Sequence, residues 1–578
     1  MQYSIVTTGL CSTTLVPPLF HRVRPKRLVF CLYGILTLIM VFSLLRRVRT
    51  QSSGSRAKPI KSSMTVSTIV IAAATLITKV ISLLREWLMA AYFGTTLRED
   101  AWLMASVIPN RLFAAIDSGL SNVLVPTLAG AEAEYSAGEI TQFLGESFSL
   151  VTLAALLLVV LGYAFTAPLI HLIAPSFSGL KFRLTVSMAR ILLPTILFWS
   201  WNGYFVGILR SHEAFAASST ASIITSILRV ASIPVLVVAF ALGVRGVAYG
   251  FTFAVFCQTV YLVAAVRRLG VAVGWRPGIS HPLTRRLISL APPFLMSSSV
   301  TTTGVLVDRI LASSLVTGSI AALNYSQVLS QLPSAVLLQS LAQPIFTRLS
   351  SHWNSVQRAD YEDLLARGFI LVAAVVIPVA LTFLLLPGPI LAAIYEHGRY
   401  SAHSRALTLK PLWGWALGIP AAGYGTYLSR ALFAQRKNRA ITWISLCTIG
   451  FNITADLLLI HPLKAFGLAL ATSLAWWLRA SLLGISLRRS LGAVSRPMID
   501  WAKLGWLAIA MAAFSAIDLG LPHLLAMGAT SHGWPLIFRL AIVLLVSWGL
   551  YLFALIKVPI LDPRDRARLQ RMTAKLRR

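Results

Sequence analysis

The sequence predicts an all-α, polytopic membrane protein with about fourteen core transmembrane helices. Three observations predict this fold class. Of the 578 residues, 57% are hydrophobic and only 12% are charged, whereas a soluble domain carries about 25% charged residues. Apolar runs of about 20 residues recur along the chain, a length that suits helices and exceeds that of barrel strands. The Lys and Arg residues gather in the loops between these runs, as in multi-pass membrane proteins.

The formal net charge of +32 would also suit a nucleic-acid-binding protein. We exclude nucleic acid as a partner, because the basic residues follow a membrane topology. The four cysteines include no CxxC pair and the ten histidines lack ligand spacing, so we expect no metal site and no disulfide framework. No phosphate loop, HExxH motif or nucleophile elbow occurs in a fitting context. We therefore expect a protein that is not an enzyme and has no cofactor.

Residues 1–63 are predicted to form an N-terminal extension. The apolar run from Leu28 to Leu45 lies between basic clusters and is interpreted as a signal anchor or an extra helix. No small-residue cleavage site follows it, which argues against a cleaved signal peptide. Because Met64 directly precedes the first core helix, either Met1 or Met64 is the natural start.

The core is predicted to contain two lobes of six helices and two final helices. The N-lobe, residues 64–268, has spans near 66–93, 99–126, 142–172, 184–210, 215–241 and 246–266. The C-lobe, residues 285–487, has spans near 287–316, 319–347, 364–386, 407–433, 438–460 and 464–487. Helices thirteen and fourteen are expected within 501–556, and residues 557–578 form a basic cytoplasmic tail that can touch anionic lipid.

An internal repeat relates the two lobes. Helices two to six and helices eight to twelve start at positions about 220 residues apart. Arg85-Glu86 in helix one has a counterpart in Asp308-Arg309 of helix seven, and Pro109 is matched by Pro333. We therefore predict two bundles related by a pseudo-twofold axis, an arrangement typical of transporters whose substrate site lies between the halves.

The loops predict the orientation of the chain in the membrane. Basic residues concentrate after helices six, eight, ten and twelve and at the C-terminus. The even-numbered loops and both core termini are therefore expected to be cytoplasmic. The loops after helices three and nine are exceptions, with Lys181, Arg183, Arg399, Arg405 and Lys410.

Helix one carries Lys79, Arg85 and Glu86 within an apolar segment. A charge at the centre of a transmembrane helix costs roughly 2.5–3.5 kcal/mol on insertion scales, so such residues usually face a cavity or a partner. Lys79 and Glu86 lie two turns apart on one face, and Arg85 lies about 100° further round. An interfacial position with snorkelling side chains is the alternative for Arg85 and Glu86.

In helix two, Pro109 removes a backbone hydrogen bond and permits a bend. The bend would project Arg111 into a central space. Pairing of Arg111 with Asp117 or Asp100 is the alternative reading.

In helix seven, Asp308 and Arg309 form a candidate buried pair, for which a purely structural role is the alternative. Arg229, Asp456 and Arg479 are weaker candidates that could bridge helices.

A cavity lined by the basic residues of this set would be net positive and would suit a phosphate or a pyrophosphate. No residue is predicted to be catalytic or to bind a metal. The predicted substrate-binding residues are Lys79, Arg85, Glu86, Asp100, Arg111, Asp117, Asp308 and Arg309.

The stretch from Thr78 to Pro126 carries a set of short motifs. They are KVISLLRE at 79–86, Phe93-Gly94, Asp100-Ala101, Ile108-Pro109-Asn110 and Val125-Pro126. Weaker matches follow at 207–209, 312–315, 324–325, 331–333, 395–400 and 461–464. This pattern resembles the MurJ (MviN) family, the lipid II flippases of the multidrug/oligosaccharidyl-lipid/polysaccharide exporter superfamily. The resemblance covers nearly all of the chain from Met64 to about Ile556.

The resemblance implies fourteen helices in two lobes around a central cavity, in the bacterial cytoplasmic membrane. It implies alternating access that carries a polyprenyl-pyrophosphate-linked saccharide, lipid II or a related precursor, to the outer leaflet. Cationic cavity residues would hold the pyrophosphate, and the last two helices would form a groove for the lipid tail. Lys79 and Arg85 align with basic positions of the family, and Asp100 aligns with an acidic position.

Several family charges are replaced in this chain. Phe113 and Ala114 stand where the family commonly has two arginines, and Ser326-Gln327 stand where it has Asp-Arg. Asp117 lies one place before the family's acidic position, which Ser118 occupies. These replacements leave the cargo open between lipid II and another polyprenyl-linked glycan, and they leave open an inactive relative.

Two other functions fit the same sequence. The first is a cation-coupled antiporter of small molecules, in which Asp100, Asp308 or Asp456 would bind the coupling ion. The second is a non-transporting scaffold for envelope synthesis.

Overall fold

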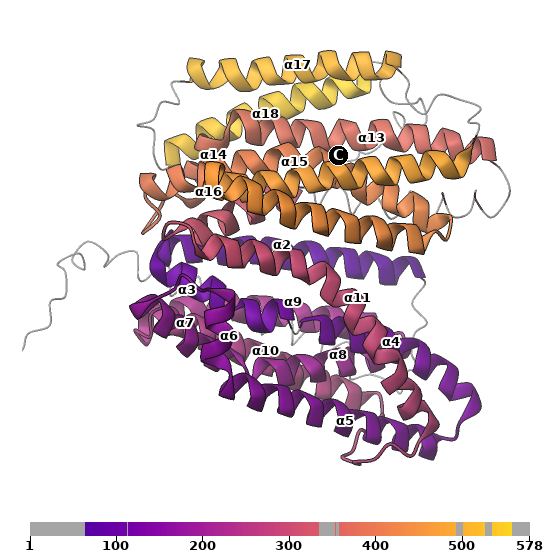
Figure 1. Cartoon of the computed structure of the whole chain (residues 1–578). Helices are drawn as coiled ribbons and strands as arrows, with labels where there is room; N and C mark the ends of the chain where they lie inside the picture. The colour runs from indigo at the N-terminus through magenta and orange to yellow at the C-terminus, as the bar shows by residue number, and fades with distance from the viewer. Residues whose placement is uncertain are drawn as a thin grey trace, which may run out of the picture. The chain divides into compact units, whose positions relative to one another are not determined.

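The computed structural model describes residues 64–112, 114–333, 349, 353, 358–492, 501–525 and 534–557. Every regular element within these ranges is a helix, which confirms the predicted fold class (Figure 1). The described residues belong to one compact unit that runs from Lys61 to Arg578. The predicted extension at residues 1–63 and residues 558–578 of the predicted tail lie outside the described ranges.

The helices of the N-lobe are shorter than the sequence predicts, because several spans are divided. The span predicted at 184–210 is two helices that meet at Leu193 and Pro194, since proline lacks the backbone N–H that would continue the first. The helix predicted at 99–126 is broken at Pro109 by a π-helical turn, as the proline suggests. The elements are α2 (Met64–Phe93), α3 (Leu97–Ala105), η2 (Ile108–Leu112), α4 (Ala114–Glu134), α5 (Ala137–Ala164), α6 (Thr166–Ile173), α7 (Gly179–Leu192), α8 (Thr195–Ser211), α9 (Phe215–Ser232), η3 (Ile233–Ala239) and α10 (Val244–Arg268).

The C-lobe follows with longer helices. Residues 319–333 are helical. Lys464 has a left-handed backbone conformation inside α16 and separates helix eleven from helix twelve. The named elements are α11 (Pro282–Ser313), α13 (Arg358–Leu385), α14 (Pro387–Tyr395), α15 (Ala402–Ala434), α16 (Asn438–Leu491), and then α17 (Trp501–Leu524) and α18 (Trp534–Lys557).

Residues with positive φ supply independent support for the repeat. Such backbone is uncommon outside glycine, yet it lies at equivalent helix boundaries of the two lobes at a spacing of about 220 residues. The five pairs are Gly94 and Gly318, Gly179 and Gly398, Glu213 and Arg436, Gly243 and Lys464, and Gly270 and Gly492, and Ala241 has no counterpart among the described residues.

Helix packing repeats in the same way. Helix one packs on helix five in the N-lobe (α2 on α9), and helix seven packs on helix eleven in the C-lobe (α11 on α16). Helix three packs on helix four (α5 on α8), and helix nine packs on helix ten (α13 on α15). This packing agrees with the two pseudo-symmetric lobes predicted from the sequence. The final pair, α17 and α18, packs on α13 and α14 (yellow in Figure 1).

Eight helices of the described ranges are long and apolar enough to cross a membrane. Most of the predicted site charges lie on α2, α3 and α11. None of these three helices is among the eight. Glu86 and Asp100 in this set are buried by other helices, and the total of fourteen spans stays a prediction.

Candidate functional site

Four connecting segments of the two lobes meet at one end of the helices. They follow helices one, three, seven and nine. The Arg399 backbone N–H donates to the Ala91 carbonyl at 2.9 Å, and the Thr95 hydroxyl donates to the Ser404 hydroxyl at 2.7 Å. We call this set of contacts, built around Glu86, Asp100, Lys181, Gly318 and Asn324, the lobe junction.

The backbones of the two lobes approach closely at three glycines. Gly94, Gly318 and Gly398 have φ values of +57°, +94° and +63°, a region that favours glycine. A Cβ atom on these glycines would overlap the backbone carbonyls of Arg399, Thr95 and Ala91, respectively. The junction therefore depends on backbone contact that larger residues would prevent.

Asp100 is the most fully bonded charge in the junction. Its Oδ2 accepts hydrogen bonds from Lys181 Nζ at 2.9 Å and from the Gly318 N–H at 2.7 Å, and its Oδ1 accepts from the Ala321 N–H at 3.0 Å. The helix at 319–333 begins directly after Gly318. A carboxylate of the N-lobe therefore caps a C-lobe helix, satisfying free N–H groups and the positive end of the helix dipole.

A second polar chain crosses the junction from α2 to α11. Arg85 donates to Glu86 Oε1, the Asn324 amide donates to Glu86 Oε2 at 3.0 Å, and Arg309 donates to the Asn324 carbonyl oxygen at 3.1 Å. Glu86 is 3% exposed, whereas the Arg85 side chain is 31% exposed. One residue from each of the two pairs that the repeat matched, Glu86 and Arg309, thus contacts Asn324.

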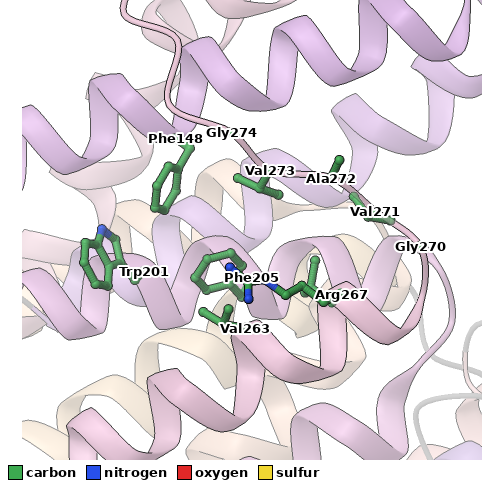
Figure 2. A pocket seen from close by; sticks show the side chains of 11 residues that line it. Phe148, Trp201, Phe205, Val263, Arg267, Gly270, Val271, Ala272, Val273 and Gly274 are labelled. Carbon is green, nitrogen blue, oxygen red and sulfur yellow. The ribbon is translucent and has the colours of Figure 1, made fainter.

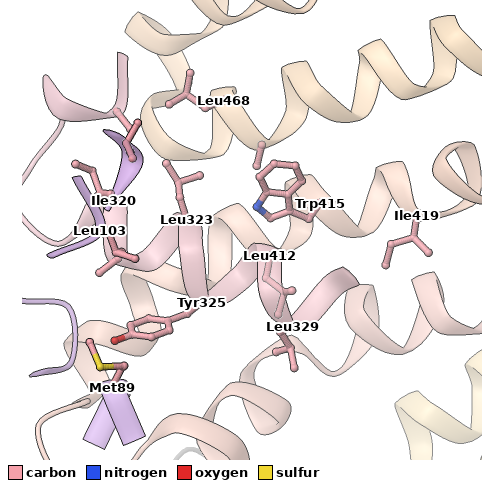
Figure 3. Close-up of a cluster of buried hydrophobic side chains, with 14 of the residues drawn as sticks. Met89, Leu103, Ile320, Leu323, Tyr325, Leu329, Leu412, Trp415, Ile419 and Leu468 are labelled. Carbon is pink, nitrogen blue, oxygen red and sulfur yellow. The ribbon is translucent and has the colours of Figure 1, made fainter. Parts of the chain in front are cut away.

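Apolar side chains of both lobes surround these polar contacts. Met89 and Leu103 of the N-lobe lie in the same buried cluster as Ile320, Leu323 and Tyr325 of the C-lobe (Figure 3). The Tyr325 hydroxyl donates to the Gly94 carbonyl at 3.2 Å. Such packing excludes water and strengthens each ionic contact within the junction.

A pair of carboxyl groups lies in the C-lobe, where α11 packs on α16. Asp308 and Asp456 are within hydrogen-bonding reach of each other. The Asn452 amide donates to Asp456 Oδ2 at 2.9 Å. One oxygen of each carboxyl group is buried and has no partner among the described residues. Two carboxyl groups this close must share a proton or a cation.

Among the eight predicted site residues, the structure gathers Arg85, Glu86, Asp100 and Arg309 at the junction. Lys79 is exposed on α2. The side chains of Arg111 and Asp117 lie outside the described residues, and Asp308 lies beside Asp456 as described above. The weaker candidate Arg229 has its guanidinium 3.9 Å from the centre of the Phe251 ring.

Four residues in or beside the junction are not among the site residues predicted from the sequence. Lys181, which the sequence places in a loop, lies in the first turn of α7 and pairs with Asp100. Arg405, another exception to the loop-charge rule, pairs with Glu396 at 2.7 Å. The departure of Lys181 and Arg405 from the loop-charge rule was the signal in the sequence that could have identified them. Asn324 and Glu99 gave none beyond their proximity to family motifs.

One cavity lies away from the junction. Its volume is about 540 Å³, and it is lined by aromatic rings of α5 and α8, the end of α10 and residues 270–274 (Figure 2). Arg267 supplies its guanidinium (Figure 2). None of the predicted site residues lines this cavity.

Comparisons of the sequence with known proteins point to one family. The sequence profile of a family described as "Lipid II flippase MurJ" matches residues 89–539. The "Probable lipid II flippase MurJ" of Rickettsia prowazekii is 27% identical over 432 residues, covering 72% of this chain and 82% of the relative. The "Lipid II flippase MurJ" of Burkholderia cenocepacia is 24% identical over 446 residues, covering 74% of this chain and 84% of the relative.

Solved structures share the fold. A "Lipid II flippase MurJ, inward closed conformation" has a TM-score of 0.69 at 21% identity, and the match covers 85% of this chain and 100% of that chain. An inward-facing multidrug resistance MATE family transporter of the MOP superfamily has a TM-score of 0.61 at 13% identity, covering 73% and 98% of the two chains.

Proposed function

Since the chain belongs to the lipid II flippase MurJ family, we propose that it carries a polyprenyl-diphosphate-linked saccharide, lipid II or a related precursor, across the cytoplasmic membrane by alternating access. The observation that carries this proposal is the cap that Asp100 of one lobe places on a helix of the other. Such a contact holds the lobes together at one end and is lost when they separate. A transporter needs a seal of this kind on each face in turn.

The lobe junction is proposed to be the outer seal. It is built from the odd-numbered connections, which the distribution of Lys and Arg assigns to the outer face. Two of the five basic exceptions, Lys181 and Arg405, support this orientation, because each is neutralised by a carboxylate. The conformation described here is then closed to the outside.

The predicted site residues divide into three proposed roles. Lys79, Arg85 and Arg111 bind the diphosphate, with Asp117 near them. Glu86, Asp100 and Arg309 close the junction. Asp308 belongs to the coupling-ion site. Partial exposure of the Arg85 side chain supports its role, since a guanidinium has five N–H donors and its contact with Glu86 uses one nitrogen.

The proposal is tested by reconstituting the full chain in vesicles with a fluorescent lipid-linked diphosphate saccharide. Flipping is measured as loss of probe protection from an impermeant quencher. Protein-dependent flipping is expected, and its absence would favour the scaffold function. Rescue of cells depleted of MurJ then identifies the cargo. Flipping without rescue would point to a glycan other than lipid II.

Coupling to a cation is favoured by the Asp308–Asp456 pair. A cation bound between these carboxyl groups would replace the shared proton and would bridge α11 and α16. We expect Asp456→Asn to abolish the dependence of flipping on a sodium, potassium or proton gradient, with about a tenfold lower driven rate. Asp363→Asn is the matched control, because Asp363 lies in the same lobe and pairs with Arg367 on the surface of α13. Equal cation dependence in wild type and Asp456→Asn would exclude this site.

Drug-resistance assays address the small-molecule antiporter. A resistance phenotype that is lost in Asp308→Asn would favour that function over flipping of a lipid-linked saccharide.

A further inference from the structure

We propose that Glu99 is a proton-binding site of the lobe junction, and that opening of the junction releases this proton. The inference rests on the proposed alternating access, and it adds the proton as a ligand whose binding accompanies closure.

Glu99 is buried, and no hydrogen bond from a described residue replaces the water that its carboxyl group loses. Its side chain is 0% exposed, and neither carboxyl oxygen has a hydrogen-bond partner among the described residues. Burying an isolated ionised carboxylate in an apolar interior costs far more free energy than protonating it. In the closed junction Glu99 therefore holds a proton.

The surrounding cations are engaged elsewhere. Arg85 of α2 donates to Glu86, Lys181 of α7 pairs with Asp100, and Arg309 of α11 donates to Asn324. Glu86 and Asp100 add negative potential around Glu99. Because these carboxylates have their own donors and Glu99 has none, the junction favours the neutral form of Glu99 alone.

The other titratable groups near this region are Arg229 of α9, which lies over the Phe251 ring, the Glu396–Arg405 pair and four rings of the C-lobe. Tyr325, Tyr395 and Tyr400 pack on one another with ring centres 5.2–5.8 Å apart. Their hydroxyls stay neutral near neutral pH. His397 stacks on Trp87 with ring centres 4.3 Å apart, and its burial lowers the pKa of His397.

Separation of the lobes would hydrate Glu99. A hydrated glutamate is ionised at neutral pH, so the O–H bond of its carboxyl group breaks and the proton passes to water at the opening face. The closed state thus holds one proton more than the open state. By linkage, the closed-to-open ratio falls about tenfold for each unit of rising pH while this difference persists. His397 would act with the opposite sign, because its proton is bound in the open state.

The experiment measures distances between the lobes without cargo. Spin labels are placed at Leu172→Cys and Val316→Cys, which are 69% and 65% exposed, after the four natural cysteines are replaced by alanine. In the full chain in nanodiscs, the long-distance population is expected to grow between pH 5 and pH 9. Glu99→Gln, a neutral and nearly isosteric substitution, should remove this growth, and Glu99→Asp should keep it.

His397→Gln is the control and should keep the growth with rising pH. A distance distribution that does not depend on pH in the wild type, or an equal pH dependence in Glu99→Gln, overturns the proposal. Because no cargo is present, these outcomes stand apart from the flipping assay. A protein that flips the saccharide yet shows no effect of Glu99→Gln would retain the proposed function and lose this inference alone.

Discussion

Replacing Asp100 by asparagine is expected to open the lobe junction. The amide keeps the shape of the side chain, but it removes the charge that pairs with Lys181, whose side chain is only 11% exposed. The amide also presents N–H donors where the carboxylate accepts bonds from both Lys181 and the N–H groups of Gly318 and Ala321. Breaking one partner of a buried ion pair costs about 3–5 kcal/mol, which shifts the closed-to-open ratio by about two to four orders of magnitude.

The measurement is the distance between labels at Leu172→Cys and Val316→Cys, together with the flipping rate. The long distance should dominate, and flipping should fall because the outer face no longer closes. Glu396→Gln is the matched control, since Glu396 pairs with Arg405 inside one lobe. Its loss should leave the distance unchanged.

A double variant separates the effect of losing the ion pair from the effect of leaving Lys181 buried without a partner. In Asp100→Asn with Lys181→Met, no charge remains buried without a partner, so part of the closure should return. An Asp100→Asn protein with the wild-type distance distribution would show that the cap does not hold the lobes together.

Replacing Arg85 by alanine is expected to abolish transport while the protein still inserts. A hydrogen bond to a charged group contributes about 1.5–3 kcal/mol, so diphosphate affinity should fall about 10–100-fold. Arg85→Lys should recover only part of this affinity, because an ammonium cannot bind a phosphate with two parallel N–H groups. Binding of inorganic diphosphate to the purified chain and flipping in vesicles are the two measurements.

Two further variants make this result specific. Arg267→Ala removes an exposed guanidinium at the cavity of Figure 2, far from the predicted site, and should bind diphosphate normally. Arg85→Gln combined with Glu86→Gln removes the charged pair together. If that double variant binds diphosphate as tightly as the wild type, Arg85 serves the junction and does not serve the cargo.

Much of the architecture can be predicted from the sequence because it depends on local patterns. Apolar runs of membrane length, loops rich in Lys and Arg, and Pro109 within a helix predict helices, boundaries and a break without knowledge of any partner. The repeat is also local in this sense, since Arg85-Glu86 and Asp308-Arg309 recur at a regular spacing. The break at Leu193–Pro194 was not predicted, because a break and a short loop are similar in sequence, whereas the boundary predicted between 460 and 464 agrees with the interruption at Lys464.

The roles of the individual charges could not be predicted from local patterns, because they depend on contacts between distant segments. Glu99 and Asp100 are adjacent acidic residues, and the family resemblance singles out Asp100 without indicating how the environments of the two carboxyl groups differ. The tertiary structure brings Lys181 and the backbone of Gly318, which is 218 residues away, to Asp100 and brings no donor to Glu99. One carboxylate consequently joins the two lobes as a charge, whereas its neighbour must be neutral. The sequence alone determined that a two-lobed membrane transporter carries costly buried charges, and only the packing of the lobes decided which of those charges are satisfied.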